Sequence, residues 1–183
     1  MSSSTPTGSS QILDINKTLI VRRFGKLELG YTQIPVDRKT CLGNPFYLAN
    51  VHDAEERKRV CEAHQAYINA ILNDKPFDID EYARENNLKR VRNFTVNNEE
   101  IRSEINNIAE RVKRGEKIQL VCYCHPRQCH ADNYVKAIKE IINQSTIKER
   151  VANLERKEKQ ERAKQKASPA KGQPRKGKDI GLS

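Results

Sequence analysis

The amino-acid sequence predicts a mixed α/β fold, a three-layer sandwich around a mostly parallel sheet, with a basic tail at its C-terminal end. Residues 97–142 show a helix, a strand and a second helix joined by short connections, which is the building unit of such sandwiches. Connections of this kind between parallel strands are right-handed. Short apolar runs at residues 19–31 add strands near the N-terminus.

Composition indicates how the chain is organised. Apolar residues make up 36% of the 183, below the roughly 45–50% of an average globular protein. The deficit lies at the ends, because 56 of the 133 residues from 12 to 144 are apolar. We therefore expect a disordered tail over 1–11, one α/β domain over 12–144, and a basic helix with a disordered end over 145–183. A domain of this size folds without disulfides or a metal.

In the N-terminal half, the pattern predicts strands and then a loop. The aliphatic run at residues 19–21 precedes the alternating residues Leu27, Leu29 and Tyr31, and together they predict one or two strands. Residues 41–46, CLGNPF, predict a loop, because Gly and Asn tolerate unusual backbone angles and Pro fixes its own.

Three helices are predicted from caps and apolar spacing. Asp53 can cap the first helix, and Glu56, three residues later, can return the hydrogen bond. Residues 80–85 predict a short second helix. The third begins after Asn97 and stops at Gly115.

The C-terminal half predicts one buried strand and two helical stretches. Residues 117–124 are strongly apolar on one face, which indicates a strand, and a loop of five residues leads to the next helix. Residues 146–167 also predict a helix, whose only apolar stripe is Ile147, Val151 and Leu154.

The segment 122–132, CYCHPRQCHAD, places five potential ligands or reactive groups within nine residues, at the end of a strand and the start of a helix. Ligands bind at such carboxyl ends of strands in open α/β sheets. One interpretation is a zinc site formed by Cys122, Cys124, Cys129 and His130. The spacing argues against it, because structural zinc ligands usually come in pairs separated by two to four residues.

A second interpretation makes this turn a reactive or anion-binding site. At a helix N-terminus, beside Arg127, the pKa of Cys129 would be lowered and backbone N–H groups could hold a phosphate. The candidate catalytic residues are then Cys129, His130 and Asp132. A third interpretation remains open, in which the cysteines are small buried residues and His130 caps the helix locally.

Two separated motifs resemble one known family. The segment LGNPF at residues 42–46 and the pattern CxCxPxxCHxD at 122–132 are similar to domain of unknown function 4326, found in bacteria and phages. The similarity spans residues 31–143. The family has no established activity, but the resemblance implies a Rossmann-like fold in which the GNPF loop and the Cys-His turn form one site. The ligand-binding residues we expect there are Arg38, Gly43, Asn44, Arg57 and Arg127.

Charge suggests a second partner. Residues 145–183 hold 12 Lys and Arg against 5 Asp and Glu, which is +7 of the total of +10, whereas residues 1–144 hold 22 against 19. Such a tail suits DNA or RNA, bound through Lys148 to Lys178, although a solubilising helix has the same composition.

Three functions follow from these patterns. The first is a small α/β domain, with or without enzymatic activity, that binds a nucleotide or another phosphorylated ligand. The second is a nucleic-acid-binding accessory protein with structural zinc, and the third is a protein-interaction module without a ligand. No stretch approaches the roughly 18 consecutive apolar residues of a membrane span, and residues 1–11 do not resemble a secretory signal. We therefore expect a cytoplasmic protein without a membrane partner, whose five cysteines are reduced.

Overall fold

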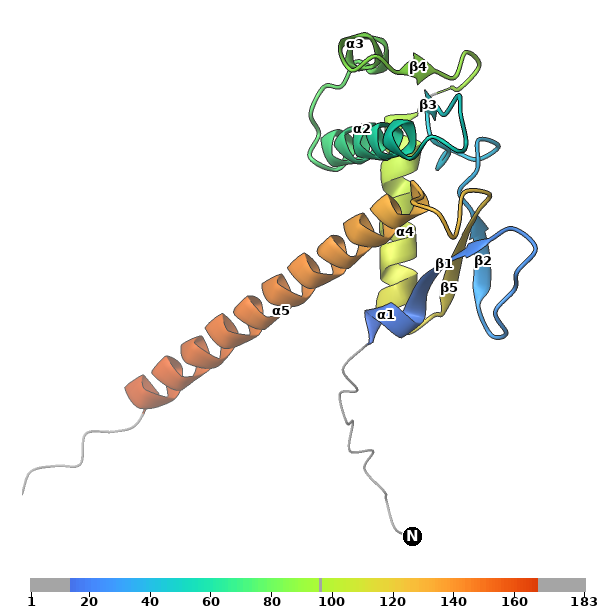
Figure 1. The fold of residues 1–183 in the computed structure, drawn as a ribbon. Coiled ribbons are helices and arrows are strands. Elements are labelled where there is room, and N and C mark those ends of the chain that lie inside the picture. Colours follow the sequence, from blue (N-terminus) through green and yellow to red (C-terminus); the bar gives the residue numbers. More distant parts are fainter. Residues whose placement is uncertain (1–13, 96, 168–183) are drawn as a thin grey trace, which may run out of the picture. The chain divides into compact units, whose positions relative to one another are not determined.

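A computed structural model describes residues 14–95 and 97–167 (Figure 1). The chain divides into two compact units, Met1–Gln144 and Ser145–Ser183, and each is described by itself. The expected disordered segments, 1–11 and from 168 onward, lie outside the described residues.

A three-stranded parallel sheet forms the centre of the first unit. Its order is β1 (Leu19–Arg23), β5 (Ile118–Cys122) and β2 (Thr32–Pro35). Both outer strands run parallel to β5, so all three end at the same edge. The predicted mixed α/β fold with a parallel sheet is confirmed.

The connection between β1 and β2 differs from the prediction. Leu27 and Leu29 are 65% and 96% exposed and lie in this connection, so the expected strand there is wrong. Gln119 of β5 holds the connection in place, because its buried amide accepts from the N–H of Glu28 at 3.0 Å and donates to the carbonyl of Lys26. The connection therefore crosses one face of the sheet, a contact that alternation alone does not reveal.

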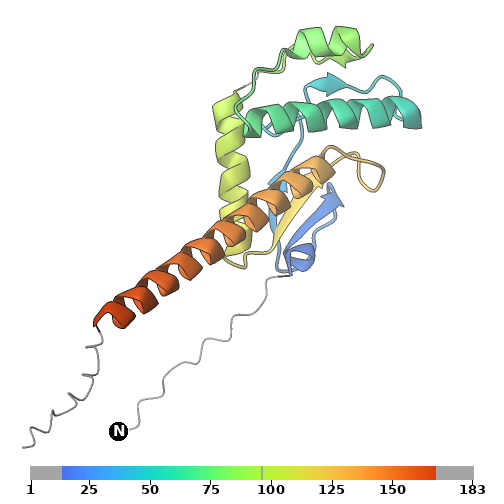
Figure 2. The ribbon, with the colours of Figure 1, turned by 90° about the vertical axis from the view of Figure 1, so that its left-hand side faces the viewer.

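Helices pack against the other face of the sheet, where α4 (Asn98–Lys113) and the start of α5 (Ala131–Ala167) lie (Figures 1 and 2). Ile118 and Leu120 of β5 share one core with the apolar residues of these helices, and Phe46 joins it fully buried. A separate antiparallel pair of short strands completes the fold. The remaining elements are α1 (Ile15–Thr18), β3 (Phe46–Tyr47), α2 (Ala54–Leu72), α3 (Ile79–Glu85) and β4 (Lys89–Arg90).

The helix starts follow the sequence closely. Asp53 caps α2 by accepting from the N–H groups of Glu55 and Glu56, and Asn97 caps α4 by accepting from the N–H of Glu100. The expected hydrogen bond from the Glu56 side chain back to Asp53 is not formed. The Glu56 carboxylate accepts instead from the N–H groups of Ala49 and Asn50. Glu56 thereby ties the incoming loop to α2 beside the site described below.

The second unit contributes residues 145–167 of α5, which are helical as expected. The apolar stripe of Ile147, Val151 and Leu154 is exposed. Across residues 14–95 and 97–167, no helix combines the length and apolar character needed to cross a membrane.

Candidate functional site

A pocket of about 370 Å³ opens at the carboxyl ends of β2 and β5. The segment after β2, the GNPF loop, the first turns of α2 and the turn after β5 supply its walls. The sequence-predicted residues that it brings together are Arg38, Asn44, Arg57, Cys122, Cys124 and His130. The two motifs therefore do meet at one place, as the resemblance implied.

The GNPF loop is held against the segment after β2 by a close backbone approach. A Cβ atom on Gly43 would lie 2.7 Å from Arg38 Cα and 2.8 Å from the carbonyl oxygen of Asp37. Asn44 Oδ1 accepts from the N–H of Phe46 at 2.9 Å, so the Asn44 side chain also shapes the loop. Gly43 does not line the pocket, and its contribution is this packing.

Arg57 supplies a buried positive charge to the pocket wall. The residue is only 7% exposed, and its guanidinium donates to the carbonyl oxygens of Val51 at 2.7 Å and Gln128 at 3.4 Å. Within the described residues no carboxylate lies within the 4.0 Å of an ion pair with it. Arg38 is more exposed and lies over the Tyr47 ring at 5.5 Å.

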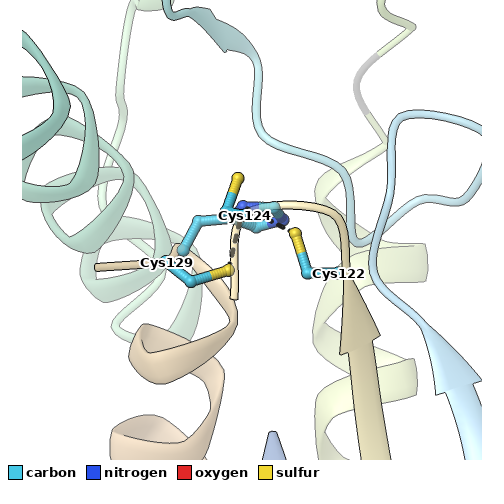
Figure 3. Close-up of side chains that lie close together, drawn as sticks. Cys122, Cys124 and Cys129 are labelled. Carbon is cyan, nitrogen blue, oxygen red and sulfur yellow. Dashed lines mark hydrogen bonds between the residues drawn. The ribbon is translucent and has the colours of Figure 1, made fainter. Parts of the chain in front are cut away.

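The four metal-type side chains predicted from the sequence gather beside the pocket. One ligand atom from each of Cys122, Cys124, Cys129 and His130 lies within 4.8 Å of the others. Figure 3 shows the three cysteines close together, at the end of β5, in the following turn and in the segment before α5. His130 Nδ1 is 3.8 Å from Cys122 Sγ and 4.0 Å from Cys129 Sγ. A set of three sulfurs and one imidazole suits a soft metal ion.

The four groups also shift one another's protonation. Hydrogen bonding to Cys122 and then Cys129 lowers the pKa of the partly exposed Cys124 thiol. Hydrogen bonding to Cys122 and then Cys124 raises the pKa of Cys129, which is only 1% exposed. Burial lowers the pKa of His130, but hydrogen bonds to Cys122 and Cys124 outweigh it and raise that pKa to about 10. A buried Cys129 with a raised pKa is a poor nucleophile.

Arg127 and Asp132 are predicted site residues that, like Gly43 and Cys129, do not line the pocket. Arg127 is exposed and donates to the Val51 carbonyl at 2.7 Å. Asp132 accepts from the Cys129 N–H at 3.1 Å, and its own N–H donates to the Cys129 carbonyl. Its carboxylate thus stabilises the start of α5, as a lone acid in a first helical turn usually does.

Sequence reasoning gave Cys61 and His64 no role, yet both adjoin the site. Cys61 lines the pocket, and burial raises its pKa to about 12. His64 is fully buried with its ring 5.1 Å from that of His130, and Asn133 Nδ2 lies 3.2 Å from His64 Nδ1. Burial holds the pKa of His64 well below its usual value. His64 recurs at helical spacing with the buried residues Val60 and Tyr67 of α2, but only the fold reveals its partner Asn133, 69 residues away.

A protein-family model for Domain of unknown function (DUF4326) matches residues 21–144. The chain belongs to this family. The DUF4326 match confirms the predicted family, and the matched range contains every residue that lines the pocket. It ends at residue 144, where the first structural unit also ends. No curated protein and no solved structure matches the chain.

Proposed function

We propose that this domain binds a phosphorylated small molecule, specifically a nucleotide, in the pocket between the GNPF loop, α2 and the Cys-His turn. The observation that carries the proposal is Arg57, a buried cation on the pocket wall with no carboxylate partner among the described residues. The location agrees, because ligands of parallel α/β sheets bind outside the carboxyl ends of the strands.

The energetics of Arg57 favour an anionic ligand. Removing an ion from water costs several kcal/mol, and the cost is recovered only with good partners. The carbonyls of Val51 and Gln128 supply two hydrogen bonds but no opposite charge. A phosphate can accept two parallel N–H bonds from a guanidinium and neutralise it. Arg38 and Lys39 add positive charge at the exposed part of the same wall.

The rest of the pocket favours a ligand with an apolar body. Phe46, Leu48, Val51 and Val60 line the wall beside Arg57. A volume of about 370 Å³ lies in the range of small-molecule sites, roughly 300–1,000 Å³. A nucleoside attached to the phosphate fits this combination, since its base can lie against apolar side chains.

Thermal unfolding of the full chain with a panel of ligands tests the proposal. The panel holds ribonucleoside mono-, di- and triphosphates, the matching nucleosides and inorganic pyrophosphate. A ligand at 100 times its Kd stabilises a protein by about 2.7 kcal/mol, which raises the melting temperature of a domain this size by several degrees. We expect nucleotides to produce this shift and the nucleosides not to.

Arg57→Met and Arg59→Met form the matched pair of variants. Arg59 is on the same helix but exposed and outside the pocket. Truncating one partner of a buried charge pair costs about 2–5 kcal/mol, so Arg57→Met should weaken nucleotide binding at least roughly 20-fold, and Arg59→Met should not. Equal binding of nucleosides and nucleotides, or full binding by a folded Arg57→Met protein, would contradict the proposal.

Residues 145–167 support a second function, nonspecific binding of nucleic acid. The helix carries eight Lys and Arg against four Glu, and from 153 to 164 all of its side chains are exposed. A basic exposed helix releases counterions from a polyanion, which gives affinity without sequence preference. The rest of the expected binding segment, up to Lys178, lies outside the described residues.

A further inference from the structure

We propose that Cys122, Cys124, Cys129 and His130 hold a zinc ion in a closed, tetrahedral centre that forms one wall of the pocket. The proposal concerns the cluster itself and does not depend on what the pocket binds. It is argued from the separations of the ligand atoms, the orientation of the imidazole and the surroundings of the sulfurs.

The separations match what a zinc ion requires. Zinc bonds sulfur at about 2.3 Å and nitrogen at about 2.0–2.1 Å, so tetrahedral angles place sulfur and nitrogen ligands about 3.6 Å apart. His130 Nδ1 lies 3.8 Å from Cys122 Sγ and 4.0 Å from Cys129 Sγ. All four ligand atoms fall within 4.8 Å of one another. Sulfur ligands of such an ion lie about 3.8 Å apart, so shifts of no more than about 1 Å would complete the centre.

The imidazole is already oriented as a ligand. His130 Nε2 lies 2.6 Å from the carbonyl oxygen of Val36. A carbonyl oxygen can only accept a hydrogen bond, so Nε2 carries the proton and donates it. Zinc binding would displace the proton from Nδ1, and it is this nitrogen that faces the sulfurs. Metal-bound histidines almost always donate their second N–H to a carbonyl or carboxylate in this way.

The surroundings favour thiolates held by a metal. The N–H of Ala131 donates to Cys129 Sγ at 3.4 Å, so the start of α5 holds that sulfur in place. Cys122 and Cys129 are 2% and 1% exposed, so water is largely excluded from their side of the cluster. Buried thiolates require a compensating cation, and zinc binding removes the thiol protons as it supplies one.

The fold also explains why the sequence spacing is unusual for zinc. Paired zinc ligands normally lie two to four residues apart on one short loop. Here Cys122 ends β5, Cys124 lies in the turn, and Cys129 and His130 directly precede α5. A strand end and a helix start bring the ligands together, so no such loop is needed. Because Cys122, Cys124 and His130 also line the pocket, the metal would fix that wall.

The test is the zinc content of the full chain purified without chelator, measured by elemental mass spectrometry. We expect one zinc per chain in the wild type, much less in Cys124→Ser, and one in Cys41→Ser. Cys124 is partly exposed, so its replacement disturbs the core least, and Cys41 is a half-buried thiol outside the cluster. Circular dichroism establishes that both variants are folded.

Cobalt replacement gives a second measurement that does not depend on any variant. Apo protein loaded with cobalt(II) should show the strong visible bands of a tetrahedral thiolate site. A wild type that retains neither zinc nor cobalt would overturn the proposal. So would a Cys124→Ser protein with full zinc, or a disulfide between two of the cluster cysteines. These results leave the nucleotide proposal intact, since none of them measures ligand binding.

Discussion

Replacing Gly43 by alanine tests how the GNPF loop builds the pocket. An added Cβ would lie 2.7 Å from Arg38 Cα, 2.8 Å from the Asp37 carbonyl oxygen and 2.9 Å from Phe94 Cε2. Carbon atoms in contact prefer about 3.5–4.0 Å, so a displacement of roughly 0.8 Å is required. Two of the three contacts are to backbone, and a change of rotamer cannot relieve them.

The cost of Gly43→Ala follows from this geometry. Overpacking a well-filled interior typically costs about 1–3 kcal/mol, which lowers the melting temperature of a domain near 150 residues by roughly 2–12 °C. The displaced segment carries Arg38, and it follows directly on Val36, whose carbonyl orients His130. We therefore expect Gly43→Ala to lose stability and nucleotide affinity together, as measured by thermal unfolding and isothermal titration calorimetry.

Gly25→Ala is the control for this prediction. Gly25 lies between β1 and β2 with a φ of +81°, and a Cβ there meets no atom within 4 Å. Alanine should cost about 1–2 kcal/mol through backbone strain alone and leave ligand binding unchanged. A Gly43→Ala protein with wild-type melting temperature and affinity would refute the packing argument.

Three further predictions concern the fold and the tail. The hydrogen bond and ion pair with Arg111 lower the pKa of Glu116 to about 2, so this contribution to stability is present above about pH 4.5 and is lost as the pH falls towards 2. The stability advantage of the wild type over Glu116→Gln, followed by urea unfolding, should therefore shrink from pH 6 to pH 3, and a constant difference would contradict the assignment. Gln119→Leu leaves two backbone groups of the β1–β2 connection without their hydrogen-bond partners, so we expect about 2–5 kcal/mol of destabilisation in the same assay. A loss of less than about 1 kcal/mol would show that the Gln119 amide does not hold the connection. The full chain should bind DNA or RNA in a salt-sensitive way in a filter-binding assay, and a chain ending at residue 144 should not. Equal binding by the two chains would show that the tail is not the binding element.

The local parts of the fold could be predicted because their signals are local. Asp53 and Asn97 cap their helices as the sequence indicated, and the apolar stripe of α4 is buried. Leu27 and Leu29 were misread, since their alternation imitates a strand while the chain crosses the sheet as an irregular connection. The Gln119 amide holds that crossing through contacts more than 90 residues apart, which no local pattern encodes.

The site was predictable in its position more than in its chemistry. The two motifs indicated which segments meet, and the structure brings them to one pocket. The guanidinium of Arg57 donates to the carbonyl of Val51, and the ring of His130 is oriented by the carbonyl of Val36. The positions of both carbonyls follow only from the assembled fold. The sequence spacing argued against zinc because zinc ligands usually come in pairs on one short loop. Here the four candidate ligands lie instead at the end of a strand and the start of a helix.

A crystal structure of the full chain grown with a nucleoside monophosphate tests the central claim most directly. The account predicts the phosphate within hydrogen-bonding distance of the Arg57 guanidinium and the nucleoside against Phe46 and Val60. A nucleotide bound only along residues 145–167, or an empty pocket at saturating nucleotide, would contradict it.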